Sequence, residues 1–326
     1  MKRPPSINAD KVCAHWRLWM GVAFQHVRLK VQKTPKLQGS IEIPGSKSHT
    51  IRALVIASLA EGRSEILSPL ISADAMACLR ACQALGAKVQ VEGGKWVVEG
   101  TGGQIQAPDN VIDVGNSGTT LRLVTGMACH GLQYTVLTGD DQTRRRLMGP
   151  LLVALKNLGA EAFSTRGNGL APVVVRGKLK GGRTQIEGMT SQFLSSLLIN
   201  MPLAEGDAEI QPLHLQEKPY VEMTLWWLNN QGILYEHEGL DYFKIKGGQR
   251  YRSFRERIPG DFSSATFPLC AAAMSESDVL LKGLDMEDSQ GDKKVISYLE
   301  EMGARIQISK EGVRVQGGRL RGLELD

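Results

Sequence analysis

The sequence repeats one pattern of apolar residues and glycines about every 72 residues, a period typical of repeat-built folds. Helix-like segments end at four glycines spaced 73, 73 and 71 residues apart, namely Gly86, Gly159, Gly232 and Gly303. Apolar residues lie seven and four positions before each of them, as Leu79 and Cys82 do before Gly86. This spacing indicates an amphipathic helix that ends at a C-terminal glycine. The 326 residues therefore contain four copies of one unit.

Two strand-like runs follow each glycine. The first alternates between polar and apolar residues, as in residues 88–91 and 305–308. The second ends at another glycine, in residues 96–99, 173–176, 242–246 and 313–316. Each unit is therefore predicted to contain a β-hairpin.

A second helix, apolar nearly all round, precedes each amphipathic helix. These helices open on small hydroxyl residues at 46–48, 117–120, 190–192 and 263–264, which are predicted N-caps. A helix that is apolar on every side is a buried one. The unit is thus helix, strand, helix, strand, strand, and four copies predict a repeat-built α/β fold. A doubly wound nucleotide-binding sheet is disfavoured, because no G-x-G-x-x-G follows a strand.

Composition narrows the class of protein. With 42% hydrophobic and 22% charged residues the chain reads as soluble and globular, and its length alone suggests two domains. A net charge of +5 and 6% aromatic residues give no support to nucleic-acid binding. No apolar run approaches the roughly 20 residues of a membrane span. The five cysteines form neither a disulfide framework nor a zinc motif, so we expect a reduced, cytoplasmic setting.

Residues 1–26 stand apart from the repeats. They are basic, contain Trp16 and Trp19, and have the single acid Asp10. They lack the apolar block and cleavage site of a secretory signal. We expect a disordered extension or an upstream start codon ahead of Met20, with an organelle-targeting segment as the weaker alternative.

Cations gather at the starts of the predicted buried helices. They are Lys47, Arg52, Arg122, Arg144, Arg145 and Arg146. Helix N-termini that share one face also offer free N–H groups and partial positive charge, which favour phosphate and carboxylate. Each cation alone could be an ordinary solvated surface residue. Their shared placement favours a cleft for a small substrate with several negative charges.

Six motifs follow one another in a distinctive order. They are Pro44-Gly45-Ser46-Lys47-Ser48, Arg52-Ala53-Leu54, Gly115-Asn116-Ser117-Gly118-Thr119-Thr120-Leu121-Arg122, Ser191-Gln192-Phe193-Leu194, Lys218-Pro219-Tyr220 and Gly260-Asp261-Phe262-Ser263-Ser264-Ala265. Together they resemble the 5-enolpyruvylshikimate-3-phosphate synthases, from about residue 27 to the end of the chain. The resemblance implies an enolpyruvyltransferase-like, inside-out α/β barrel of βαβαββ units, with the buried helices pointing into a cleft between two domains.

The resemblance also implies a reaction. The family transfers the enolpyruvyl group of phosphoenolpyruvate to the 5-hydroxyl of shikimate 3-phosphate and releases phosphate, by addition followed by elimination. This step belongs to the shikimate pathway, which leads to chorismate and the aromatic amino acids, and it is the target of glyphosate. The expected partners are these two small molecules, without cofactor, metal, nucleic acid or membrane. Members of the family are usually monomeric.

The resemblance assigns roles to residues of this chain. Lys47 would contact both substrates and is the catalytic candidate. The other predicted ligands of shikimate 3-phosphate are Ser48, Arg52, Thr190, Ser191, Gln192 and Tyr220. Those of phosphoenolpyruvate are Asn116, Gly118, Arg146 and Gln192, with Thr119, Arg122 and Asp261 in support. Alternatives stay open for Gly118 as a plain helix-start glycine, Tyr220 as a cap on the core, and Asp261 as a helix cap.

Four places depart from the family pattern. Glu217 precedes Lys218 where many members have Ser, and Leu147 follows Arg146 where Pro is usual. The other two are Ser72-Ala73-Asp74, where Ser-Asp-Asp is usual, and His49-Thr50-Ile51. The change at Glu217 predicts that one phosphate contact is lost or replaced.

The number of units is a larger departure, since the family has six. We expect one complete domain at residues 47–258 and one incomplete domain formed by residues 27–46 and 259–326. Residues 259–326 are expected to fray or aggregate unless another chain completes them. The family's principal acid/base carboxylates would lie beyond Asp326.

Two other functions remain as alternatives. The first, suggested by the number of units, is a truncated remnant that binds shikimate 3-phosphate without turnover. The second is the sister transferase that acts on UDP-N-acetylglucosamine. That transferase is expected to have Lys-Asn where this chain has Lys47-Ser48, and a cysteine in the loop that here spans residues 139–143. This chain has neither, so the alternative is disfavoured.

Overall fold

The structure is a computed structural model that describes residue 34 and residues 36–324. The predicted extension at residues 1–26 lies outside these residues. Contacts divide the chain into a unit of residues 1–35 and a unit of residues 36–326, and every element below belongs to the second. None of the helices in the described part of the chain combines the length and apolarity needed to cross a membrane.

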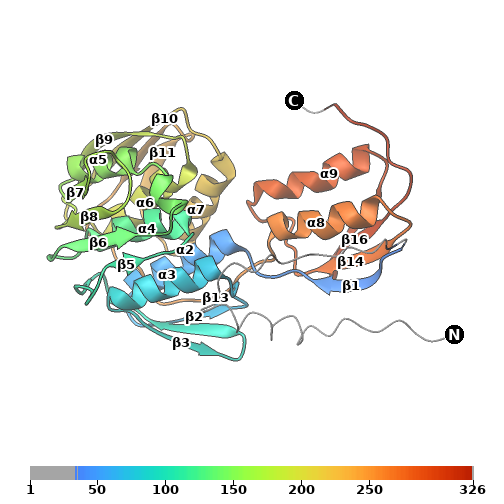
Figure 1. The fold of residues 1–326 in the computed structure, drawn as a ribbon, viewed down its shortest axis with the longest axis horizontal. Coiled ribbons are helices and arrows are strands. Elements are labelled where there is room, and N and C mark those ends of the chain that lie inside the picture. Colours follow the sequence, from blue (N-terminus) through green and yellow to red (C-terminus); the bar gives the residue numbers. More distant parts are fainter. Residues whose placement is uncertain (1–33, 35, 325–326) are drawn as a thin grey trace. The chain divides into compact units, whose positions relative to one another are not determined.

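Four copies of the predicted unit follow one another along the chain (Figure 1). The first contains α2 (Lys47–Leu59), β2 (Arg63–Leu67), α3 (Ala73–Ala84), β3 (Lys88–Glu92) and β4 (Lys95–Glu99). The second contains α4 (Gly118–Ala128), β6 (Thr135–Thr138), α5 (Gly149–Asn157), β7 (Glu161–Ser164) and β8 (Val173–Arg176). The third contains α6 (Ser191–Asn200), β10 (Ala208–Leu213), α7 (Lys218–Asn230), β11 (Tyr235–Glu238) and β12 (Tyr242–Ile245).

The fourth unit contains α8 (Phe262–Ala273), β14 (Asp278–Lys282), α9 (Lys294–Glu301), β15 (Arg305–Ser309) and β16 (Gly312–Gln316). Four further strands lie before the units: β1 (Gln38–Glu42), β5 (Ile112–Asp113), β9 (Gly182–Glu187) and β13 (Arg255–Arg257). Short 3-10 turns are η2 (Thr143–Arg145), η3 (Met201–Leu203) and η4 (Gly291–Lys293). The predicted repeat and the repeat-built α/β fold are confirmed.

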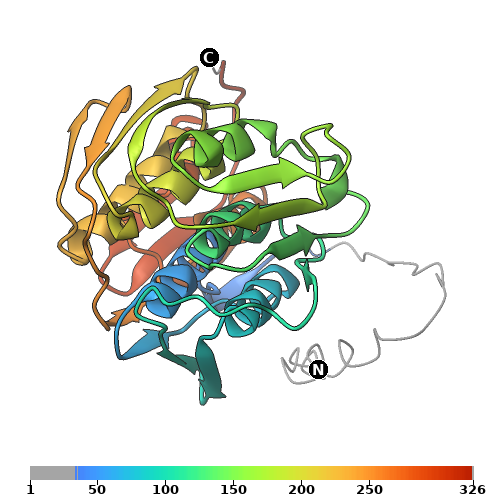
Figure 2. The same ribbon diagram turned by 90° about the vertical axis from the view of Figure 1, so that its left-hand side faces the viewer.

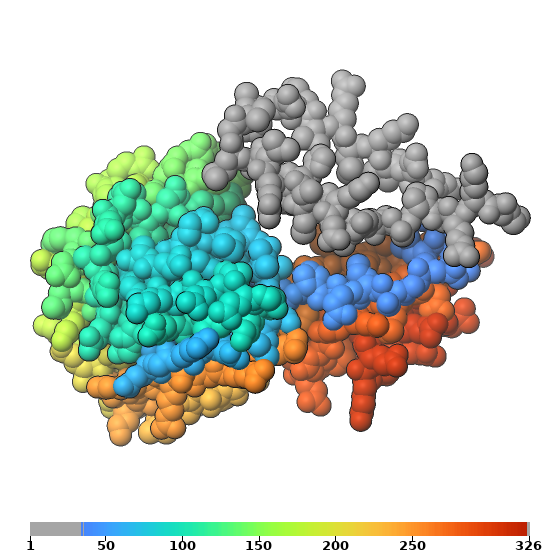
Figure 3. Space-filling model, turned by 90° about the horizontal axis from the view of Figure 1, so that it is seen from below, coloured from blue at the N-terminus to red at the C-terminus, as the bar shows by residue number. Residues whose placement is uncertain are grey.

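Each unit has a four-stranded sheet with one strand order. In the second and third units the orders are β5-β6-β8-β7 and β9-β10-β12-β11, with the first two strands parallel and the hairpin antiparallel. The first and fourth units exchange their edge strands. β13 completes the sheet of the first unit, and β1 completes that of the fourth, where Gln38 is paired with Asp278. The blue segment of β1 therefore lies along the orange and red residues in Figure 3.

The exchange makes the chain cross twice between the first and fourth units. Gly45 and Gly260 meet in an antiparallel bridge where the two crossings touch. A Cβ atom at Gly45 would collide with the carbonyl oxygen of Ser68, and one at Gly260 would lie 2.6 Å from the carbonyl oxygen of Gly283. Both crossings therefore require glycine, because backbone approaches backbone too closely for a side chain.

Two hydrophobic clusters fill the interior of residues 36–324. The larger one joins the first three units around α2, α4 and α6, which contact one another in that order (Figure 2). The smaller one joins Ile43 to apolar residues of α8, α9, β14 and β16. The domain boundaries near residues 46 and 259 stay a prediction, as does the fraying of residues 259–326.

The first helix of each unit, namely α2, α4, α6 and α8, begins at a residue whose side chain caps it. Ser46, Ser117 and Thr190 each cap a helix by accepting a backbone N–H, from His49, Thr120 and Gln192 respectively. The prediction for the fourth cap was wrong. Asp261 caps α8 through the N–H of Ser264, while Ser263 and Ser264 lie inside the first turn. Carboxylates cap as well as hydroxyls do, so a cap of either kind was chemically possible.

Candidate functional site

A cavity of about 320 Å³ lies where several helices begin. Apart from Leu70, which lies between β2 and α3, its walls come from the first two turns of α2, α4, α6, α7 and α8, or the residues just before them. The predicted site residues that line it are Lys47, Ser48, Arg52, Thr119, Ser191, Gln192, Tyr220 and Asp261. The others in its wall are Leu70, Glu217, Ser263 and Ser264. Converging helix starts direct backbone N–H groups and partial positive charge toward this cavity, which suits an anion.

The Arg52 guanidinium is held almost entirely by the protein. Its Nε donates to Thr224 Oγ1 at 2.8 Å, and its Nη2 donates to Ser195 Oγ and the Tyr220 carbonyl oxygen at 3.0 Å each. Nη1 donates to the Ser48 carbonyl oxygen at 3.1 Å. Burial lowers the pKa of Arg52 to about 10. One of its five N–H groups remains for a ligand, so Arg52, predicted to bind shikimate 3-phosphate, cannot offer a bidentate fork in this structure.

Lys47 carries the first positive charge of the cavity. Its Nζ lies 3.2 Å from Asp74 Oδ2, and the two side chains are 46% and 26% exposed. Asp74 belongs to the segment that departs from the family pattern. Such an exposed pair is weak, and its ammonium can turn to an anion in the cavity.

Glu217 was not among the predicted site residues, although its departure from Ser was noted. One oxygen of its carboxylate, Oε2, accepts from the Ser191 backbone N–H at 3.2 Å and from Ser191 Oγ at 3.0 Å. The same oxygen accepts from Thr190 Oγ1 at 3.2 Å. The start of α6 thus already holds a negative charge.

Three predicted residues meet beside the cavity, at the start of α4. Arg122 donates from Nη1 to Gln192 Oε1 at 2.7 Å, and its guanidinium lies 5.2 Å from the ring centre of Phe193. Burial, and next the charge of Arg146, lower its pKa to about 10. A Cβ atom at Gly118 would collide with Arg146 Nη1 and lie 3.0 Å from Arg122 Nη1. Gly118 therefore leaves room for two guanidinium groups, which a plain helix-start glycine need not do.

Asn116 and Thr190 do not line the cavity. The Asn116 side chain donates to Asp140 Oδ2 at 2.7 Å and to Gln142 Oε1 at 3.2 Å. The Thr143 backbone N–H and then Asn116 lower the pKa of Asp140 by hydrogen bonding. Asn116 thus fastens the loop that carries Arg146. Like Asn116 and Thr190, the residues Gly118, Arg122 and Arg146 lie outside the cavity wall.

Acidic groups surround Tyr220. The Asp261 carboxylate accepts from the Ser264 N–H at 3.1 Å and from Ser264 Oγ at 2.6 Å, and it also lines the cavity. Asp261 is thus both a cap and a cavity residue. Burial raises the pKa of Tyr220, and the charges of Asp292, Asp261 and Glu217 raise it further. Sequence reasoning missed Asp292, because folding alone brings it near Tyr220.

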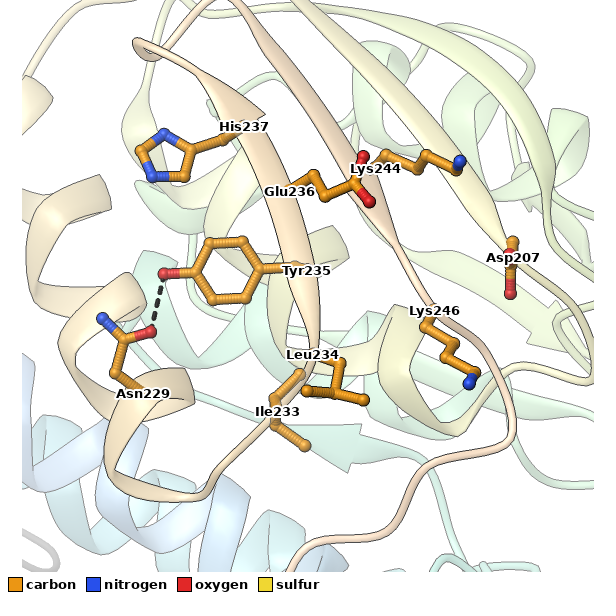
Figure 4. A pocket seen from close by; sticks show the side chains of 9 residues that line it. All are labelled: Asp207, Asn229, Ile233, Leu234, Tyr235, Glu236, His237, Lys244 and Lys246. Atoms are coloured by element: carbon orange, nitrogen blue, oxygen red, sulfur yellow. Dashed lines mark hydrogen bonds between the residues drawn. The ribbon is translucent and has the colours of Figure 1, made fainter.

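A larger hollow of about 740 Å³ lies on the hairpin of the third unit (Figure 4). Tyr235 donates to Asn229 Oδ1 there at 2.8 Å. Its charged lining mixes Lys244 and Lys246 with acids and His237, and no first helix of a unit opens into it. The smaller cavity therefore remains the candidate site.

Fold and cavity together define a class: repeated α/β units that direct helix starts and cations into one small cavity. Comparison with known proteins narrows this class. Residues 31–326 match the family model of EPSP synthase (3-phosphoshikimate 1-carboxyvinyltransferase). The chain belongs to the EPSP synthase family.

Known relatives and solved structures agree with this family assignment. The 3-phosphoshikimate 1-carboxyvinyltransferase of Acetivibrio thermocellus is 58% identical over 298 residues, which are 91% of this chain and 70% of the relative. That of Methanococcus maripaludis strain C7 is 41% identical over 306 residues, 91% of this chain and 71% of the relative. The solved EPSP synthase of Acinetobacter baumannii superposes with a TM-score of 0.75 at 27% identity, over 89% of this chain and 68% of that one.

Proposed function

We propose that the chain is a 3-phosphoshikimate 1-carboxyvinyltransferase. It transfers the enolpyruvyl group of phosphoenolpyruvate to the 5-hydroxyl of shikimate 3-phosphate and releases phosphate. The observation that carries this proposal is the cavity at the starts of α2, α4, α6 and α8. Helix N-termini and cations in this cavity, with Arg122 and Arg146 beside Gly118 nearby, suit a pair of multiply charged substrates.

The acceptor occupies the part of the cavity between α2, α6 and α7. Ser48, Ser191 and Gln192 offer polar side chains there, and Tyr220 forms the wall on the side of α7. Thr190 acts through the start of α6, which it caps. Arg52 contributes its one remaining N–H and fixes Tyr220 by holding its carbonyl oxygen.

Phosphoenolpyruvate binds on the side of α4. Arg146 and Arg122 supply positive charge beside Gly118, and Gln192 lies between this pair and the acceptor. Asn116 keeps Arg146 in place through the Asp140 loop. Lys47 reaches both substrates, so its ammonium neutralises charge as the tetrahedral intermediate forms and carries a proton during addition and elimination.

Phosphate release from phosphoenolpyruvate, measured with and without shikimate 3-phosphate, tests the proposal. Phosphate release that requires both substrates supports it. Tight binding of shikimate 3-phosphate without any release would instead favour the binding-only remnant. Replacing shikimate 3-phosphate by UDP-N-acetylglucosamine should abolish release, because the acceptor groups differ.

Two substitutions test the assigned cations. Lys47→Met and Arg146→Ala should each weaken phosphoenolpyruvate binding about 100-fold, since each leaves a substrate charge unpaired. Lys88→Met is the matched control, because Lys88 is 78% exposed and pairs with Glu99 on the first hairpin. Unchanged binding in Lys47→Met or Arg146→Ala would remove that residue from the site.

We also propose a cytoplasmic monomer. The cysteines at 78, 82 and 129 are buried free thiols, which suits a reducing compartment. Light scattering of the purified protein tests the monomer, and fractionation of the source cells tests the compartment. A stable oligomer would point to a completing chain instead.

A further inference from the structure

We propose that Glu217 is a built-in competitor of the acceptor's phosphate group. Its carboxylate occupies the start of α6, and a phosphate must displace it in order to bind there. Glu217 thereby sets the affinity for the acceptor. This inference rests on the proposed function, which supplies shikimate 3-phosphate as the acceptor.

The contacts of Glu217 are those that a bound phosphate would use. A single oxygen accepts one backbone N–H and two hydroxyls, all from Thr190 and Ser191. The first N–H groups of a helix have no partner within the helix and are the usual ligands of phosphate. The next N–H, that of Gln192, is taken by Thr190 Oγ1 at 3.4 Å. The donors at the start of α6 are therefore already engaged.

The carboxylate is placed so that it can leave. Glu217 is exposed and comes directly before α7, with a left-handed backbone at φ 53°. In the described part of the chain it forms no ion pair, so three hydrogen bonds hold it. Rotation about its side-chain bonds would carry the charge into solvent while the backbone stays in place.

Charge makes joint occupation unfavourable. Two anions at contact distance repel each other, and they do so more strongly at a protein surface than in bulk water. The cations in the cavity wall are Lys47, which pairs with Asp74, and Arg52, which retains one free N–H. Asp261 adds another negative charge to the same wall. The cavity therefore lacks the surplus positive charge that would let Glu217 stay beside a phosphate.

Calorimetric titration of the full chain with shikimate 3-phosphate tests the inference. Glu217→Ser removes the carboxylate and frees the donors, so the Kd should fall about tenfold. Glu217→Gln keeps the shape without the charge, and its Kd should fall about threefold. The Kd for phosphoenolpyruvate should change less than twofold in both variants. The Kd for inorganic phosphate, used as a second probe, should rank the parent chain and the two variants in the same order as the Kd for shikimate 3-phosphate does.

The matched control is Glu222→Gln, on the exposed face of the same helix α7. It removes the same charge from α7 without touching α6, so its Kd should equal that of the parent chain. An unchanged or higher Kd in Glu217→Ser and Glu217→Gln would overturn the inference. Equal gains in Glu222→Gln would also overturn it, because a general charge effect would then explain the result.

The two proposals fail in different ways. If the chain binds shikimate 3-phosphate but releases no phosphate, the proposed function fails, and the order of Kd values still tests Glu217. If turnover is normal and the variants bind like the parent chain, the inference about Glu217 fails alone. Melting temperatures of all variants show whether a change in Kd comes from altered folding.

Discussion

The helices α2, α4 and α6 differ from α8, although all four begin the same repeat unit. In α2, α4 and α6 the buried residues number 11 of 13, 10 of 11 and 9 of 10. In α8 they number 5 of 12; Phe267 in this helix is 78% exposed, and Met274, the residue directly after it, is 68% exposed. The same apolar pattern therefore gives two different degrees of burial.

Neighbours explain the difference. The three enclosed helices pack side by side, α2 on α4 and α4 on α6, with α3 and α7 alongside. Within residues 36–324, α8 packs on its own sheet, on α9 and on η4. Apolarity on every side predicts the burial of a helix, but other units must supply the covering surface.

A pair of Phe to Ala substitutions tests the comparison with the largest expected effect. Phe193 in α6 is 1% exposed, and Phe193→Ala should lower the free energy of unfolding by about 4 kcal/mol. Phe267→Ala in α8 should change it by less than about 0.5 kcal/mol. Urea denaturation measures both. A large loss in Phe267→Ala would show that something covers this face of α8.

The contact that joins α2 to the fourth unit gives the next effect. His49 Nε2 lies 2.9 Å from Asp288 Oδ2, and His49 Nδ1 accepts from Trp227 Nε1 at 3.1 Å. Asp288→Ala leaves the buried imidazole without this partner and should cost about 2 kcal/mol of unfolding free energy. Glu287→Ala, at an exposed neighbour, is the control. Equal free energies of unfolding for Asp288→Ala and Glu287→Ala would mean that the contact between His49 and Asp288 does not stabilise the protein.

The same pair predicts a dependence on pH. Burial tends to raise the pKa of Asp288, but hydrogen bonds from His49 and Gln290 outweigh it, and the net pKa is lowered. A lowered pKa contributes stability above the unfolded value of about 3.9, and this is lost as pH falls through the folded value. The stability gap between the parent chain and Asp288→Asn should therefore narrow below about pH 4. Unfolding free energies at pH 7, 4 and 3 measure it, and a constant gap would contradict the assignment.

Removing a helix cap should have the smallest effect on the free energy of unfolding. It should also show the smallest difference between the enclosed helix α4 and the less buried helix α8. Ser117→Ala in α4 and Asp261→Ala in α8 should each cost about 1 kcal/mol, because a cap acts on its own helix start. Urea denaturation measures the cost. If the two differ by more than about 1 kcal/mol, caps too depend on the surrounding units.

The repeat was readable from sequence because it depends on local rules. Glycines close the amphipathic helices, hydroxyl caps open three of the buried ones, and alternation marks the hairpins. Much of the cavity could also be predicted, since its residues come from helix starts. The contacts that decide its chemistry could not. Glu217 reaches α6 from the start of α7, and three of the four engaged donors of Arg52 have partners more than 140 positions away.

The exchange of edge strands also governs the order in which the molecule can be assembled during synthesis. The sheet of the first unit is completed by β13, so it lacks this edge strand until residue 257 has been synthesised. Strand β1 must wait from residue 42 until residue 278 for its partner. At roughly 5 to 20 residues per second this wait lasts roughly 10 to 50 seconds. During that time β1 exposes unpaired backbone groups to which a wrong strand can pair.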